Sequence, residues 1–232
     1  MKKLIPLIFL SLSLLPQVNT FRLWSYFNLN FKLSSDFVFT ILPGLRYEVL
    51  REKDNPKGFY MFEFFTGFSY FKSIKGINGR FPIFYYYINF PNDDYYVQSI
   101  EFLPSFQKRF GNFLIFERTI FHNRFYSNFY EDRTGYSLLI RELIQLKYIN
   151  FKYPLNIGIE PFIGIIEDNN HNPSPFGFTP KGLNSIRFYF GIDFPLFKNL
   201  ALSTNYVFEP TYSQGELTGK NHYIFFNITF NK

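Results

Sequence analysis

Three absences limit what this sequence can encode. It contains no cysteine, so neither disulfide bonds nor thiolate metal ligands contribute to its fold. After Thr20, no stretch of about 18 apolar residues is free of charged or turn residues, which argues against membrane-spanning helices. Basic residues are scattered among acidic ones, without the clustering of a nucleic-acid-binding domain. A disulfide scaffold is therefore excluded, and a helical membrane protein and a nucleic-acid-binding protein are disfavoured.

The sequence also lacks the residue spacings of known catalytic and metal sites. Its histidines are His122, His171 and His222. None has the His-x-Ser spacing of membrane deacylases or precedes the Ser-Asn-Gly run of outer-membrane phospholipases. The run from Asp168 to His171 is rich in oxygen and nitrogen donors but lacks the ligand spacing of a recognised metal site. We predict solvated or rim histidines, with His122 the least ordinary, and no catalytic residue, metal or cofactor.

The first twenty residues differ from the rest of the chain. Lys2 and Lys3 give a positive start, an apolar run follows from Leu4 to Pro16, and the segment ends at Val18-Asn19-Thr20. This order is typical of a secretory signal peptide. The alternative is an uncleaved anchor, but the run is shorter than the roughly 20 residues that a spanning helix needs. We therefore predict a signal peptide over 1–20 and one mature domain over 21–232.

Aromatic residues are unusually abundant. The chain has 35 phenylalanines and 18 tyrosines, more than a soluble domain of this size could bury in its core. An outward face in contact with lipid would accommodate them. Several aromatic residues near expected strand ends are predicted to form belts at the membrane boundary. These are Trp24, Tyr60, Tyr70, Tyr95, Tyr96, Tyr206 and Tyr212.

Most of the mature sequence alternates between apolar and polar residues with a period of two, which is the pattern of a β-strand with two different faces. Leu155, Ile157 and Ile159, for example, alternate with Asn156, Gly158 and Glu160. We count about eleven such segments, and the alternation is unclear between Phe71 and Phe90. Because bacterial barrels usually have an even strand number, we predict an all-β fold, a single antiparallel transmembrane β-barrel of 10–12 strands, with 12 favoured.

The connections between these segments alternate in length. Short turns are expected at Ser34–Asp36, Gly111-Asn112, Tyr148–Pro154 and Pro195–Asn199. Longer polar loops are expected at Arg51–Gly58, Asn123–Gly135, Glu167–Gly182 and Pro210–Lys220. Short turns at one end and longer loops at the other are typical of outer-membrane barrels. A sheet in lipid must close on itself because an open edge would leave backbone groups unpaired. A soluble β-sandwich is the alternative.

Charged residues of both signs share the polar face of the predicted strands. They form the candidate site: Arg46, Glu48, Glu63, Glu101, Arg109, Arg141, Lys147, Glu160, Arg187, Asp193 and Glu209. This set fits a structural ion-pair network that fills a narrow lumen, because buried charges are costly unless paired. It also fits a small polar conduit or a ligand pocket. Neighbours along a strand face opposite ways, so one member each of Glu117-Arg118 and Arg141-Glu142 is expected to meet lipid.

The segment from Gln98 to the end resembles a family of short bacterial outer-membrane β-barrels known only as a domain of unknown function. The resemblance rests on phrases in a fixed order: Phe116-Glu117-Arg118, Asn123-Arg124-Phe125, the strand around Arg141, Gln145 and Lys147, Gly158–Phe162, Asn184–Gly191, Asn199–Leu202 and Asn205-Tyr206. Trp24 near the start of the mature chain also fits. The chain departs from the family at Ile140-Arg141-Glu142, where the family favours Arg-x-Arg. The resemblance implies a barrel and no activity.

Three functions remain open from the sequence. The first is a non-enzymatic barrel in a bacterial outer membrane, with a structural, ligand-binding or small-solute channel role and with membrane lipid as its partner. The second is a barrel enzyme that modifies lipid, of the lipase or deacylase type. The third is a soluble periplasmic β-sandwich. The sequence indicates no protein partner.

Overall fold

The computed structural model describes residues 19–92, 95–128, 133–167, 181–213 and 215–232, and all of their regular secondary structure is β. The strands are β1 (Thr20–Lys32), β2 (Phe37–Arg51), β3 (Gly58–Ile74), β4 (Ile77–Phe90), β5 (Tyr95–Phe102), β6 (Ser105–Phe110), β7 (Phe113–Asn128), β8 (Arg133–Tyr148), β9 (Leu155–Ile166), β10 (Gly182–Phe197), β11 (Leu200–Ser213) and β12 (Glu216–Asn231). In these segments no helix is long and apolar enough to cross a membrane.

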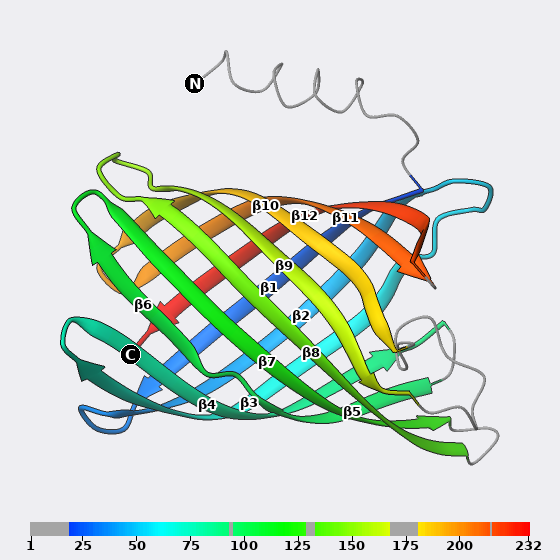
Figure 1. Ribbon diagram of the computed structural model, residues 1–232, viewed down its shortest axis with the longest axis horizontal. Coiled ribbons are helices and arrows are strands. Elements are labelled where there is room, and N and C mark those ends of the chain that lie inside the picture. Colours follow the sequence, from blue (N-terminus) through cyan, green and yellow to red (C-terminus); the bar gives the residue numbers. More distant parts are fainter. Residues whose placement is uncertain (1–18, 93–94, 129–132, 168–180, 214) are drawn as a thin grey trace.

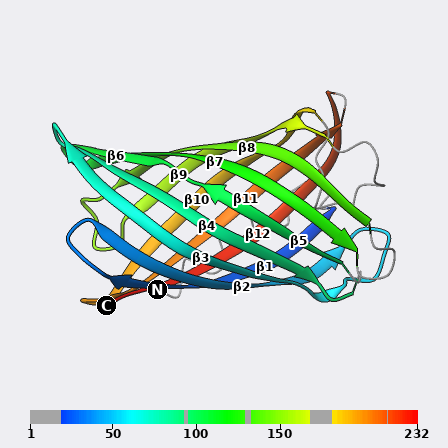
Figure 2. The same cartoon turned by 90° about the horizontal axis from the view of Figure 1, so that it is seen from below.

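The strands form one sheet that closes into a barrel (Figures 1 and 2). Successive strands pair antiparallel, and β1 closes the sheet by pairing in parallel with β12 from Thr20–Asn221 to Asn30–Asn231. Because successive strands alternate in direction, the first and last strands can pair in parallel only if the number of strand positions around the barrel is odd. There are eleven, because β5 and β6 both lie between β4 and β7 and together make one interrupted strand. The predicted all-β barrel of 10–12 strands is confirmed, and the sandwich is excluded.

The interruption between β5 and β6 has a local cause. The register against β4 is the same on both sides of the break, from the Ile83–Phe102 pair to the Arg80–Ser105 pair. Leu103 and Pro104 lie between the two strands, with Pro82 on β4 at the same level. Proline has no N–H to donate, so ladder hydrogen bonds are missing here. The remaining bonds run from Leu103 N–H to the Pro82 carbonyl at 3.1 Å and from Thr119 N–H to the Pro104 carbonyl at 3.0 Å.

The two ends of the barrel differ, as the sequence predicts. One end, the short-turn end, carries the connections 33–36, 75–76, 111–112, 149–154 and 198–199, and the other end is the loop end. Two of the tight turns use glycine at positive φ, Gly76 at 77° and Gly111 at 56°, as two-residue hairpins require. Two of the predicted long loops are wrong. At Asn123–Gly135, β7 continues to Asn128 and β8 begins at Arg133, and at Pro210–Lys220, β11 continues to Ser213 and β12 begins at Glu216. The second of these stretches contains paired strand residues such as Thr211 opposite Gly219.

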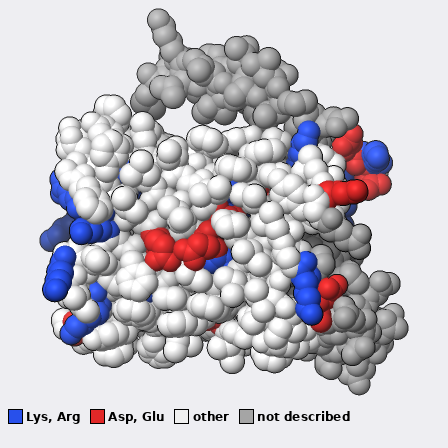
Figure 3. Space-filling model, in the orientation of Figure 1, with Lys and Arg blue, Asp and Glu red and all other residues white. Residues whose placement is uncertain are grey.

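The predicted alternation separates an inner face from an outer one. Phe102, Ile159 and Phe226 are exposed on the outside, whereas Glu101 and Glu160 are fully buried within the barrel. Figure 3 shows that the visible outer face is mostly uncharged and that its Lys and Arg side chains gather mainly toward the two ends, with a group of acidic side chains near the middle. This is the surface expected of a barrel that crosses an apolar layer between two aqueous phases.

The unclear stretch before Phe90 forms β4, and the structure explains why its alternation is lost. Its inward residues Phe84, Tyr86, Ile88 and Phe90 are buried, so both faces of this strand are apolar. Tyr86, Ile88 and Phe90 belong to an internal apolar cluster to which β3 and β5 also contribute. The interior of this barrel therefore contains an apolar cluster as well as charged residues.

The predicted aromatic belt is wrong for two of its members. Trp24 and Tyr60 are each only 1% exposed and face the interior. Trp24 packs against Tyr223 and Phe225, at ring-centroid distances of 4.4 Å and 4.3 Å. Nearness to a strand end does not reveal the face of a side chain. Trp24 has the parity of the buried Arg22, which places it inside.

Inward glycines make room for large neighbours. A Cβ atom on Gly44 of β2 would lie 2.6 Å from the ring of Tyr26 on β1, and one on Gly191 of β10 would collide with the amide of Asn205 on β11. Glycine is therefore required by close packing across neighbouring strands at these two positions.

Two acidic residues interrupt the apolar outer face. Glu117 on β7 and Glu142 on β8 have outward parity, opposite to that of Arg118 and Arg141. The Thr119 hydroxyl lies between them and donates to Oε2 of Glu142 at 2.6 Å. Figure 3 shows acidic side chains near the middle of the front face. Of each anomalous pair in the sequence, the basic member thus faces inward and the acidic member outward.

Replacing both Glu117 and Glu142 with leucine is expected to raise the free energy of unfolding. The gain should be smaller than the roughly 2–4 kcal/mol that a basic residue costs at mid-depth, because acidic residues cost less there. Denaturant unfolding of the refolded barrel in lipid vesicles measures the change. Glu52→Leu, in the exposed loop after β2, is the control and should give no gain. A loss of stability in the double variant would contradict the lipid-facing assignment.

Candidate functional site

The lumen contains a cavity of about 610 Å³ to which all twelve strands contribute side chains. We call it the lumen cavity. Its walls include the buried residues Trp24, Glu63 and Glu101 and extend to the exposed Asn78, which follows the 75–76 turn. The cavity therefore extends from deep within the barrel to the short-turn end. The apolar cluster of β3, β4 and β5 fills part of the lumen nearer the loop end.

Glu160 on β9 is the centre of the largest ion-pair network. Its carboxylate is 0% exposed and is contacted by guanidiniums from three strands. The nearest approaches are 3.1 Å from Arg118, 2.9 Å from Arg141 and 3.9 Å from Arg187. The Tyr189 hydroxyl also donates to this carboxylate. Four partners around one carboxylate offset the cost of removing its charge from water.

Arg187 extends this network to β11 and β12. Its Nε lies 3.1 Å from Oε1 of Glu209. Glu209 also accepts hydrogen bonds from the Ser185 hydroxyl, at 2.8 Å, and from the Tyr223 hydroxyl. The Arg187 guanidinium lies over the rings of Trp24 and Phe162, at 4.9 Å and 4.4 Å from their centroids. The network is thus packed between aromatic rings, which limits the space for water around it.

A second ion pair lies on β2 and β3. Arg46 pairs with Glu63, whose second oxygen accepts a hydrogen bond from the Tyr26 hydroxyl at 2.8 Å. The Arg46 guanidinium stacks on Trp24 with its central carbon 3.5 Å from the ring centroid, a cation–π contact. Trp24 therefore touches charged groups of both networks.

A third group of charges lies toward the loop end. The Glu48 carboxylate is paired with Arg22 at 3.0 Å and with Arg51 at 2.8 Å. It also accepts a hydrogen bond from the backbone N–H of Lys57, at 3.0 Å. Glu48 therefore connects the wall of the barrel to the loop between β2 and β3.

The prediction of a solvated or rim histidine is wrong for His122, which lies inside the barrel and is 1% exposed. Its Nδ1 contacts Oε1 of Glu101, and its Nε2 lies 3.3 Å from Arg141. A lipid-modifying site needs its base near the membrane rim, where acyl chains can reach it. His122 is deep in the lumen and both of its nitrogens face charged partners, so this observation does not favour the lipid-enzyme alternative. The run Asp168–His171 lies outside the described residues.

The structure places the predicted network residues inside the lumen, except for Arg109. Lys147 pairs with Asp193, whose other oxygen accepts a hydrogen bond from the Ser203 hydroxyl at 2.7 Å. Arg109 has inward parity but is exposed, and its Nε donates to the Gly111 carbonyl at 2.9 Å in the adjacent turn. The structure thus places nine of the predicted residues in buried or partly buried ion pairs, Glu101 in a buried contact with His122, and Arg109 at the rim.

Sequence reasoning missed several basic residues of the lumen. Arg118 has inward parity on β7, but its outward acidic neighbour obscured the face assignment. Arg80 lies on β4, where the apolar inner face removes the alternation that would have revealed it. Arg22 lies close to the predicted signal peptide. In each case, alternation along the strand assigns the residue to the inner face only after the bounds of the strand are known.

Within the described residues, no group of three or more histidine or acidic side chains is arranged to hold a metal ion. No family model, curated protein or solved structure matches this chain.

Proposed function

We propose that this chain is a non-enzymatic β-barrel of a bacterial outer membrane, whose side chains fill the loop-end part of the lumen and leave a ligand-sized cavity open at the short-turn end. In this proposal, residues 1–20 direct export and are removed. The long loops then face the outside of the cell and the short turns face the periplasm.

The observation that carries the proposal is the reversal of polarity between the two faces. Large apolar side chains such as Phe68, Ile83 and Phe190 are exposed around the barrel, whereas glutamates and arginines are buried within it. Soluble monomers rarely expose contiguous apolar patches larger than a few hundred Å². Membrane lipid is the partner that fits such a surface.

A cysteine-labelling experiment tests location and orientation together. The chain has no natural cysteine, so Asp54→Cys in the loop after β2 and Lys152→Cys in the turn before β9 each give a single thiol. We expect a membrane-impermeant maleimide to label Asp54→Cys on intact cells and Lys152→Cys only after the outer membrane is permeabilised. Labelling of neither variant in cells, with the protein in the soluble periplasmic fraction, would refute the proposal.

A conductance measurement distinguishes a filled lumen from a channel. We expect the purified barrel to insert into a planar bilayer without stepwise ionic currents, because apolar side chains and paired charges occupy the loop-end part of the lumen. A general porin measured in the same bilayer is the control for insertion and sensitivity. Stepwise currents from this chain would favour the small-solute channel instead.

A further inference from the structure

The walls of the lumen cavity carry more positive than negative charge. Its basic residues are Arg46, Arg80, Arg118, Arg141, Arg187 and Lys147, whereas its acidic residues are Glu63, Glu101 and Asp193. The two pairs Arg46–Glu63 and Lys147–Asp193 neutralise part of this charge. The arginines on β7, β8 and β10 contact the carboxylate of Glu160, and Arg187 on β10 is also paired with Glu209. Of the six basic residues, Arg80 therefore remains without an ion-pair partner among the described residues.

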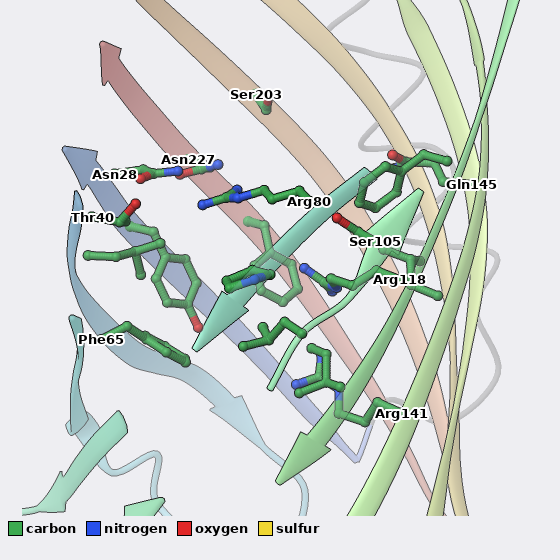
Figure 4. A pocket seen from close by; sticks show the side chains of 18 of the residues that line it. Asn28, Thr40, Phe65, Arg80, Ser105, Arg118, Arg141, Gln145, Ser203 and Asn227 are labelled. Carbon is green, nitrogen blue, oxygen red and sulfur yellow. The ribbon is translucent and has the colours of Figure 1, made fainter. Parts of the chain in front are cut away.

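Arg80 is the most unusual of these residues. Its Nε and Nη2 both donate to the Ser69 hydroxyl, at 3.1 Å and 3.0 Å, and its guanidinium lies near the rings of Phe71 and Phe84. Among the residues that the structure describes, no carboxylate forms an ion pair with Arg80. A guanidinium has five N–H donors, so most of its capacity to bind an anion is unused. Figure 4 shows its side chain projecting into the lumen cavity.

Arg118 approaches the same space from β7 (Figure 4). One of its terminal nitrogens binds Glu160 at 3.1 Å, whereas its Nε is buried and makes no hydrogen bond to any described residue. Arg80 and Arg118 both line the lumen cavity. Their two guanidiniums together contact a single carboxylate, that of Glu160, so both keep N–H donors available for an anion.

We propose that the lumen cavity binds a small organic anion, a carboxylate or phosphate monoester with an attached ring or short apolar chain, and that Arg80 and Arg118 hold its anionic group. Guanidiniums bind carboxylate and phosphate oxygens through pairs of parallel hydrogen bonds. The aromatic side chains of Phe71, Phe84 and Phe116 line the same cavity and offer an apolar surface for the rest of the molecule. A volume of about 610 Å³ lies within the usual range for small-molecule sites.

This inference rests on the proposed function only in requiring a lumen that is open at one end. It can be tested on the purified barrel without reference to cellular location or conductance. The two proposals can therefore fail separately. A barrel that is absent from the outer membrane could still bind an anion, and a correctly oriented barrel could fail to bind one.

The single tryptophan of the chain provides the measurement, because Trp24 lines the lumen cavity. Nitrophenyl groups quench tryptophan fluorescence. We expect 4-nitrophenyl phosphate or 4-nitrobenzoate to quench the fluorescence of Trp24 saturably in the folded barrel. The probe that binds with the higher affinity shows whether phosphate or carboxylate is preferred. The neutral 2-(4-nitrophenoxy)ethanol should give no saturable quenching. Inorganic phosphate should compete with 4-nitrophenyl phosphate.

Substitutions identify the arginines responsible. Arg80→Gln and Arg118→Gln should each weaken binding about tenfold or more, since each removes a charge-assisted hydrogen-bonding group. Arg109→Gln is the matched control, because Arg109 is an exposed arginine at the rim of the neighbouring β6. Heat-modifiable gel mobility verifies that every variant is folded, and Arg80→Lys should retain more affinity than Arg80→Gln.

Either of two results would overturn the inference. One is the absence of saturable quenching by both anionic probes in a folded wild-type barrel. The other is equal binding by Arg80→Gln, Arg118→Gln and Arg109→Gln, which would locate the anion elsewhere on the protein.

Discussion

Replacing Glu160 with glutamine should lower the free energy of unfolding by roughly 3–5 kcal/mol. The Glu160 carboxylate is fully buried, and Arg118, Arg141 and Arg187 all contact it, although Arg187 is also paired with Glu209. The amide keeps the shape of the side chain but removes the charge, which leaves the neighbouring guanidiniums to repel one another around a fully buried side chain. Equilibrium unfolding of the refolded barrel in lipid vesicles measures the loss. Glu216→Gln, at an exposed position that begins β12, is the control and should change stability very little.

A double-mutant cycle determines whether the ion-pair network around Glu160 excludes water. Glu160→Gln combined with Arg187→Gln should cost less than the sum of the two single changes, because each residue neutralises the other. The Arg187 change also leaves Glu209 with fewer partners, so its single cost should remain substantial. Strict additivity, together with small single effects, would indicate a water-filled lumen that screens these charges. That outcome would contradict the filled lumen that we propose.

Phe188→Arg should lower the free energy of unfolding by roughly 2–4 kcal/mol if its position is near the bilayer midplane. Phe188 lies close to the middle of β10, and its outward side chain stacks on Phe208 of β11 at a centroid distance of 6.2 Å. An arginine there would have to reach the interface or draw water into lipid. The same unfolding measurement in vesicles gives the cost.

An outward phenylalanine near the membrane boundary provides the control for this change. Phe37 begins β2 beside the 33–36 turn and is exposed at the short-turn end. Phe37→Arg should cost only about 0–1 kcal/mol, because a basic residue near the interface reaches water. Equal losses at both positions would show that the effect comes from lost aromatic packing. No loss at Phe188 would show that this face of the barrel does not meet lipid.

Much of the candidate site could be predicted from the sequence, because the face of a strand residue follows from its parity. Glu101, Glu160 and Arg187 were assigned to the interior from alternation alone, and each is buried there. The method failed where the alternation was absent or ambiguous. Arg80 was missed because β4 is apolar on both faces. Trp24 was assigned to the wrong surface because nearness to a strand end was weighed above parity.

The sequence by itself determined the class of fold and the division into an apolar outside and a charged inside. Both follow from the period-two geometry of β-strands, which is a local property of the chain. Only the tertiary structure decided how the strands close and which charges meet. The parallel pairing of β1 with β12, the joining of β5 and β6 into one position, and the convergence of Arg118, Arg141 and Arg187 on Glu160 all join residues far apart in sequence. These contacts depend on barrel closure and register, which alternation within one strand cannot specify.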